Sequence, residues 1–313
     1  MTSKWKKFGI IAITILALFI VGCTAEDTGE EVTPENGVDT EEEEVDTDNG
    51  ESAAEALDYT ITGIDAGAGV VQGAERAVED YGLDFDVQTS SSAAMTQALG
   101  DAIDNEEAIV VTGWSPHWKF QSYELKYLED PEGSFGEAET INTVTRIGLE
   151  DDMPEAFQIL DNFYWDPADI ESVMLDIIEG AEPEDAARTW IEDNEDKVSE
   201  WTDGVDEVDG EEIDIAYVAW ETEIASTNVI MHVLSDMGYD VTITQVENGP
   251  MWNAVATGNT DAIVAAWLPL THADYYEDFE DDVVDLGPNL EGARIGLVVP
   301  AYMDIDSIAD LAD

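Results

Sequence analysis

The chain has 313 residues, 44% of them hydrophobic, and carries 74 acidic side chains against 10 basic ones, a formal net charge of −64 at pH 7. Phosphate groups would repel so negative a chain, which excludes nucleic acid and anionic lipid headgroups as electrostatic partners. A single cysteine excludes an intrachain disulfide, and the hydrophobic share, with nine tryptophans, is too high for a wholly disordered acidic polymer.

The N-terminus carries a targeting signal. Three lysines precede an apolar run over 8–21, after which Gly22-Cys23 gives way to acidic residues. The run is shorter than the roughly 20 apolar residues that a transmembrane helix needs, so the pattern predicts a secretory signal peptide over 1–22. The segment ending at Cys23 resembles a bacterial lipobox. We therefore expect Cys23 to be lipidated and to anchor the protein to the outer face of the cell membrane.

The segment 23–56 is acidic and lacks aromatic residues, so it is predicted to be a disordered tether with the fold beginning near Leu57. Acidic residues continue along the whole chain. We interpret them as an adaptation to high salt, because a Debye length of about 3 Å in molar salt screens the self-repulsion. Calcium binding is the alternative, but no D-x-[DN]-x-[DN]-G loop occurs. No metal site is predicted.

Strand and helix patterns then alternate twice. The first unit has strands over 59–64, 85–89 and 109–112 and helices over 70–81 and 93–103; the second has strands over 213–218, 241–246 and 262–266 and helices over 226–237 and 250–257. The units match in order about 150 residues apart, as in an internal repeat. The alternation predicts an α/β fold with two lobes, each built on a mostly parallel sheet and separated by a ligand cleft. Residues 154–201 are expected to be helical cladding, with Trp165, Trp190 and Trp201 as packing residues.

Three tryptophans fall at strand ends, where open α/β sheets bind ligands: Trp114, Trp220 and Trp267. An aromatic cage binds a quaternary ammonium by cation–π attraction, worth about 2 kcal/mol or more per desolvated face. The other interpretation is three core tryptophans, which their position at a rim disfavours.

The turn after the first strand offers an anion site. The N–H groups of Gly69 and Val70 would point out of a helix N-terminus toward a carboxylate, and His272 could donate a further hydrogen bond. Asp65 is interpreted as a turn or capping residue, His117 as a candidate for lining the cleft and His232 as a packing residue. The glycine spacing G-x-G-x-x-x-G is one residue longer than the dinucleotide fingerprint, and no cofactor is predicted.

Several motifs together resemble the glycine betaine-binding lipoproteins of Gram-positive osmoprotectant ABC importers, the OpuA type. The resemblance runs from about residue 61 to the C-terminus and is carried by Gly63-Ile64-Asp65-x-Gly67-x-Gly69, Thr112-Gly113-Trp114-x-Pro116-His117-Trp118, Leu125-Lys126-Tyr127-Leu128-Glu129-Asp130-Pro131, Tyr217-Val218-Ala219-Trp220, Gly249-Pro250-Met251-Trp252 and Ala266-Trp267-Leu268-Pro269-x-Thr271-His272. It implies a bilobal fold of the type II periplasmic-binding-protein kind, whose lobes close by hinge motion over glycine betaine or proline betaine.

The resemblance also implies residue roles. Trp114, Trp220 and Trp267 would surround the ammonium, while Gly69, Val70 and His272 would hold the carboxylate. Val70 stands where the family often has isoleucine, and Ala66 replaces a common proline; neither change removes a group that the ligand would use.

The lobes implied by the resemblance are 57–140 plus 298–313, and 141–297. The protein would be a monomeric extracytoplasmic receptor and not an enzyme. It would deliver its ligand to an ABC permease whose ATPase subunit is on a separate chain, since no G-x-x-x-x-G-K-[ST] motif occurs here. Two alternatives stay open: a choline or carnitine receptor of the same fold, and an extracytoplasmic hydrolase, for which no G-x-S-x-G or H-E-x-x-H motif is present.

Overall fold

The computed structural model describes residues 52–312, so the signal peptide, Cys23 and most of the expected tether lie outside the described residues. No helix within 52–312 is long and apolar enough to cross a membrane. The first element, α1 (Ala53–Ala56), falls in the segment expected to be disordered. Ser52 and Glu55 cap it reciprocally, and Ala54 is buried in the core. The ordered chain therefore begins before Leu57.

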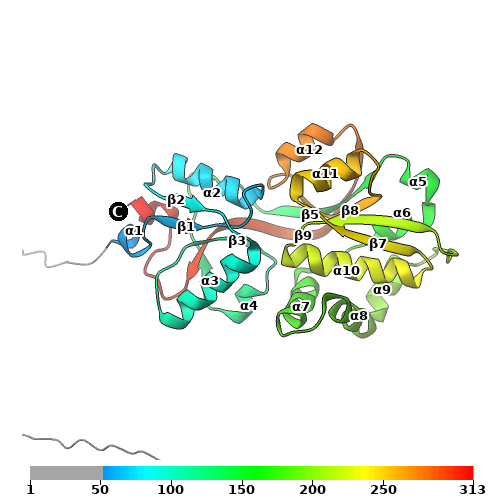
Figure 1. Cartoon of the computed structure of the whole chain (residues 1–313), viewed down its shortest axis with the longest axis horizontal. Coiled ribbons are helices and arrows are strands. Elements are labelled where there is room, and N and C mark those ends of the chain that lie inside the picture. Colours follow the sequence, from blue (N-terminus) through cyan, green and yellow to red (C-terminus); the bar gives the residue numbers. More distant parts are fainter. Residues whose placement is uncertain (1–51, 313) are drawn as a thin grey trace, which may run out of the picture. The chain divides into compact units, whose positions relative to one another are not determined.

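The first lobe is built on three parallel strands in the order β2-β1-β3: β1 (Thr60–Thr62), β2 (Asp86–Gln88) and β3 (Val111–Ser115). Two long helices, α2 (Gly69–Asp80) and α3 (Ser92–Asn105), lie on opposite sides of these strands (Figure 1). The lobe also contains α4 (Lys119–Ser122), β4 (Leu125–Tyr127) and the C-terminal 3-10 helix η1 (Ile308–Ala312), which contacts α1.

The second lobe repeats this arrangement with the order β7-β6-β8: β6 (Glu212–Tyr217), β7 (Asp240–Gln245) and β8 (Ala262–Leu268). Its helices are α10 (Glu221–Asp236), α11 (Asn248–Ala256) and α12 (Ala273–Phe279). The two matching strand orders confirm the predicted repeat. Helix α10 begins five residues before the predicted start at 226, because Trp220 is its N-cap and two glutamates in its first turn favour the positive helix end.

Two strands connect the lobes: β5 (Glu139–Arg146) and the long β9 (Val283–Pro300). Strand β9 pairs with β5 up to Ala293 and with β3 from Arg294 onward, antiparallel in both cases. One nine-stranded sheet results, in the order β2-β1-β3-β9-β5-β8-β6-β7 with β4 beside β9, and Figure 1 shows β9 running through both lobes. This confirms the bilobal α/β class but adds antiparallel strands. Strand β9 changes its pairing partner before residue 298, where the chain was expected to return to the first lobe. The detailed lobe boundaries stay a prediction.

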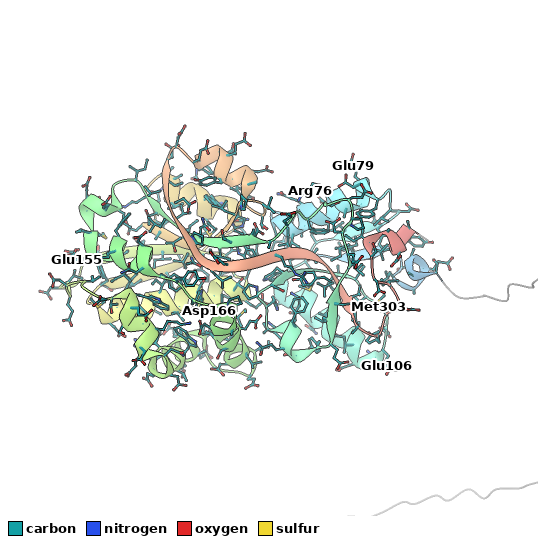
Figure 2. All side chains as sticks on the ribbon, turned by 180° about the vertical axis from the view of Figure 1, so that it is seen from behind. Arg76, Glu79, Glu106, Glu155, Asp166 and Met303 are labelled. Carbon is teal, nitrogen blue, oxygen red and sulfur yellow. The ribbon has the colours of Figure 1, made fainter. Side chains whose placement is uncertain are left out.

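Five helices occupy the connection between β5 and β6: α5 (Leu149–Asp152), α6 (Pro154–Asn162), α7 (Pro167–Ile178), α8 (Pro183–Asp193) and α9 (Glu195–Trp201). Trp165, Trp190 and Trp201 are all buried there, and Trp190 stacks on Trp201 with ring centroids 5.9 Å apart. These tryptophans are packing residues, as interpreted from the sequence. Exposed acids project from the periphery, including Glu79 and Glu106 (Figure 2).

Candidate functional site

A cavity between the lobes brings together five of the six residues predicted to bind ligand. It is lined by Ile64, Ala68, Gly69, Val70, Trp114, Trp220, Trp267, Thr271 and Ile295 and has an empty volume of about 280 Å³. The lining side chains are mainly apolar and aromatic, as in sites for small ligands. The sixth residue, His272, follows Thr271 and is fully buried.

The three tryptophans reach this cavity from different elements. Trp114 and Trp267 belong to the last residues of β3 and β8, and Trp220 is the N-cap of α10. Each is between 3% and 6% exposed. Because β3 belongs to one lobe and the other two elements to the second, the cage is complete only while the lobes are together.

An ionisable side chain contacts each of these tryptophans. The indole N–H of Trp220 donates to Asp65 Oδ2 across the cleft at 3.1 Å, and that of Trp267 donates to Glu223 Oε1 at 2.8 Å. The Lys119 ammonium lies 4.2 Å from the ring centroid of Trp114. None of these three contacts is predicted from the sequence. Asp65 was interpreted only as a turn residue, and its backbone carbonyl does accept a turn hydrogen bond from the Ala68 N–H.

The N-terminus of α2 faces the cavity. Gly69 and Val70 are its first two residues, so their N–H groups have no acceptor within the helix. The α-carbon of Gly69 lies against the other lobe: a Cβ there would come within 2.2 Å of the Thr271 carbonyl oxygen. Glycine is thus required by the approach of the two lobes.

His272 is held in one tautomer by its neighbours. Its Nδ1 accepts from the Trp267 backbone N–H at 3.1 Å and from the Trp252 indole N–H at 3.4 Å, and both of these groups can only donate. The proton of the neutral ring is therefore on Nε2, which is buried and has no acceptor among residues 52–312. Burial lowers the pKa of His272 to about 3, so the ring stays neutral at physiological pH.

Further cross-lobe hydrogen bonds surround the cavity. The Ser92 hydroxyl donates to Glu221 Oε2 at 2.6 Å, and the Tyr275 hydroxyl donates to the Gly67 carbonyl at 3.2 Å. Together with the bond from Trp220 to Asp65, they show the lobes in a closed arrangement.

The other two histidines each contact neighbouring protein groups. His117 packs edge-on against Trp114 with centroids 4.7 Å apart, and burial lowers its pKa to about 4. Its Nε2 lies 3.6 Å from Glu221, beyond hydrogen-bond distance. His232 contacts the Arg188 guanidinium and the Glu184 carbonyl, in keeping with a packing role.

Two buried groups near the cage titrate close to neutrality. Burial raises the pKa of Glu223 to about 7 against hydrogen bonds from Thr222 and Trp267, which lower it. Burial lowers the pKa of Lys119 to about 7, with Glu221 acting in the opposite direction. No cluster of His, Cys, Asp or Glu within the described part of the chain could hold a metal ion.

Comparison with known proteins gives consistent matches. The family described as the substrate binding domain of ABC-type glycine betaine transport system matches residues 33–193 and 211–313. The glycine betaine/carnitine transport binding protein GbuC of Listeria monocytogenes is 53% identical over 261 residues, which are 82% of this chain and 87% of the relative.

Solved structures also match part of the chain. The closed, liganded structure of lactococcal OpuAC with glycine betaine is 47% identical with a TM-score of 0.46, and the match covers 49% of this chain and 63% of that one, less than two thirds of its length. An ABC-transporter choline binding protein in complex with choline is 26% identical with a TM-score of 0.42, over 48% of this chain and 54% of that one.

Proposed function

Because this chain belongs to the family of substrate-binding domains of ABC-type glycine betaine transport systems, we propose that its cleft captures glycine betaine or a closely related betaine, such as proline betaine, for import. The observation that carries the proposal is the cavity between the lobes, which combines three tryptophans with a helix N-terminus. The tryptophans can bind a trimethylammonium group and the helix N-terminus can bind a carboxylate. The cavity can therefore bind both ends of a zwitterion that carries these two groups.

The ammonium would lie among Trp114, Trp220 and Trp267. It has no N–H to donate, so cation–π attraction and burial of its methyl groups supply the binding free energy. The rings are already desolvated by closure, which increases the attraction.

The carboxylate would accept from the N–H groups of Gly69 and Val70 and from Nε2 of His272. None of the three donors has an acceptor among residues 52–312, and a buried donor without an acceptor costs about 1 to 3 kcal/mol. Ligand binding would remove that cost. The neutral His272 would donate without changing its protonation state.

The proposal also covers the location of the protein and the chains with which it works. Cleavage before Cys23 and lipidation of that residue would leave an extracytoplasmic monomer tethered by its acidic segment to the outer face of the membrane. The permease and its ATPase subunit would be separate chains, and the receptor would perform no chemistry on its ligand.

Carnitine and choline are the other candidate ligands. Carnitine, which occurs in the name of the Listeria relative, has both charged ends but a longer spacing between them. Choline has no carboxylate and would leave the donors of Gly69, Val70 and His272 unsatisfied, so betaines fit better. A hydrolase would need an acid/base pair in the cleft, and the cavity lining contains no carboxylate; its one hydroxyl, that of Thr271, donates to Glu139.

The test is a titration of the unlipidated protein, begun after Cys23, with glycine betaine, proline betaine, carnitine and choline in molar salt. Tryptophan fluorescence and calorimetry should both show saturable binding of the betaines. Loss of two cage faces in a Trp114→Ala, Trp267→Ala double variant should weaken betaine binding about a thousandfold. Absence of binding by folded wild-type protein would refute the proposal. A His272→Ala variant that binds the preferred ligand normally would point to choline.

A further inference from the structure

Glu223 lies next to two of the cage tryptophans, Trp220 and Trp267. It is 1% exposed and sits in the first turn of α10, three residues after the N-cap Trp220. One carboxylate oxygen accepts from the Trp267 indole N–H at 2.8 Å and the other from the Thr222 hydroxyl at 2.6 Å. The carboxylate thus holds the N–H edge of Trp267, a residue that lines the cavity.

The contacts of Glu223 suit the ionised form. The indole N–H can only donate, and the N-terminus of a helix favours a negative charge. Burial works against ionisation, so the carboxylate needs a compensating positive charge.

No described residue supplies that charge. The ion pairs within residues 52–312 do not include Glu223. The one buried lysine near the cage, Lys119, lies over Trp114 instead. A cation bound in the cage against Trp267 would be the missing counter-charge.

We propose that Glu223 is a specificity-determining residue, whose negative charge at the edge of Trp267 makes the cage prefer a quaternary ammonium over an uncharged group of the same shape. This inference rests on the proposed function. The carboxylate acts directly through Coulomb attraction and indirectly by making the indole ring more electron-rich, and both effects strengthen binding of a cation only. A group with the same methyls but no positive charge would gain no binding free energy from the carboxylate.

The size of the effect follows from Coulomb's law. Two unit charges about 7 Å apart at an effective dielectric constant of about 20 attract strongly enough to change a binding constant by more than tenfold. Molar salt should weaken this attraction only slightly, because the carboxylate and the cage are both buried.

The experiment compares glycine betaine with 3,3-dimethylbutanoate, in which carbon replaces the quaternary nitrogen and the carboxylate is kept. Dissociation constants for both are measured by calorimetry, or by competition for the weaker ligand, at pH 8 and in molar salt. The variant is Glu223→Gln, whose amide oxygen can still accept from Trp267. The matched control is Glu200→Gln, the same change at an exposed position of α9.

Glu223→Gln should weaken betaine binding at least tenfold and change isostere binding little, so that the preference for the cation falls by the same factor. Glu223→Asp, which keeps the charge, should keep most of the preference, and Glu200→Gln should leave both constants unchanged. Equal losses for both ligands in Glu223→Gln would mean that Glu223 only orients Trp267 and would overturn this inference while the proposed function stands. Wild-type protein that binds neither ligand would refute the proposed function itself.

Discussion

Gly69 should decide whether the lobes can close, because its α-carbon touches the opposite lobe. In a Gly69→Ala variant, the new methyl group would come within 2.2 Å of the Thr271 carbonyl oxygen and 2.7 Å of its side-chain methyl group. Thr271 cannot easily withdraw, since its N–H donates at 2.9 Å to Glu139, which is 3% exposed and also accepts the Thr271 hydroxyl. The lobes would have to separate instead.

Separation would break the contacts made only on closure. These include the bonds from Trp220 to Asp65 and from Ser92 to Glu221, each charge-assisted and worth about 1.5 to 3 kcal/mol. Losing both amounts to about 3 kcal/mol or more, or more than a hundredfold in Kd, before any loss from an incomplete cage. The fold itself should not suffer, because alanine in the first turn of a helix is at least as favourable as glycine.

The assay pairs betaine titration with thermal unfolding of the ligand-free protein. The matched control is Gly67→Ala in the same turn, where the nearest heavy atom to a new Cβ is the Tyr275 hydroxyl oxygen at an ordinary 3.6 Å. We expect Gly69→Ala to lose binding without losing Tm, and Gly67→Ala to retain both. Wild-type affinity in Gly69→Ala would refute the argument, because the ligand would then bind without the contact between Gly69 and Thr271.

Three further predictions concern stability and one separates stability from binding. Lys119→Met should raise the free energy of unfolding at pH 7 by about 1 to 4 kcal/mol, measured in denaturant, because it removes a buried amino group that has no hydrogen-bond acceptor among residues 52–312. The gain should shrink toward pH 10.5, since the unfolded chain then no longer takes up the proton. His117 and His272 stay neutral in the fold but bind protons in the unfolded chain below about pH 6.5, so they lower the free energy of unfolding between pH 6.5 and pH 4, while Glu223, whose pKa is raised to about 7, acts in the opposite direction; a His117→Gln variant should therefore lose less stability than the wild type over this range, and parallel profiles would contradict the neutrality of that ring. The Tm of the wild-type protein should rise from low to molar NaCl as salt screens acidic repulsion; an unchanged Tm would argue against salt adaptation. Trp190→Ala should cost about 3 to 5 kcal/mol of stability while leaving the betaine Kd of the folded protein unchanged.

Local patterns in the sequence were sufficient for the elements and for most of the cavity lining. Strand and helix periodicities depend on which side chains a segment buries, so the repeat and the α/β class could be recognised before the lobes were assembled. Trp114, Trp220 and Trp267 were identifiable because each stands at or just after the end of a predicted strand. Gly69 and Val70 were identifiable because they begin a helix.

The capping of α1 and the early start of α10 were missed for a local reason. Ser52 and Glu55 resemble the acidic segment before them, and Glu221 and Glu223 resemble loop residues until the helix N-terminus beside them is known. Acidic residues are common throughout this chain, so their presence by itself carries little information on structure.

Tertiary packing decided the connection of the lobes and the partners of the cage. A strand pattern does not specify which neighbours its backbone will pair with, and only the register shows β9 changing from β5 to β3 at Ala293 and Arg294. One glutamate among 74 acids is buried against Trp267, and one lysine is buried against Trp114. Such contacts join residues far apart in the chain, and their burial free energy depends on the whole assembled core, which no local pattern records.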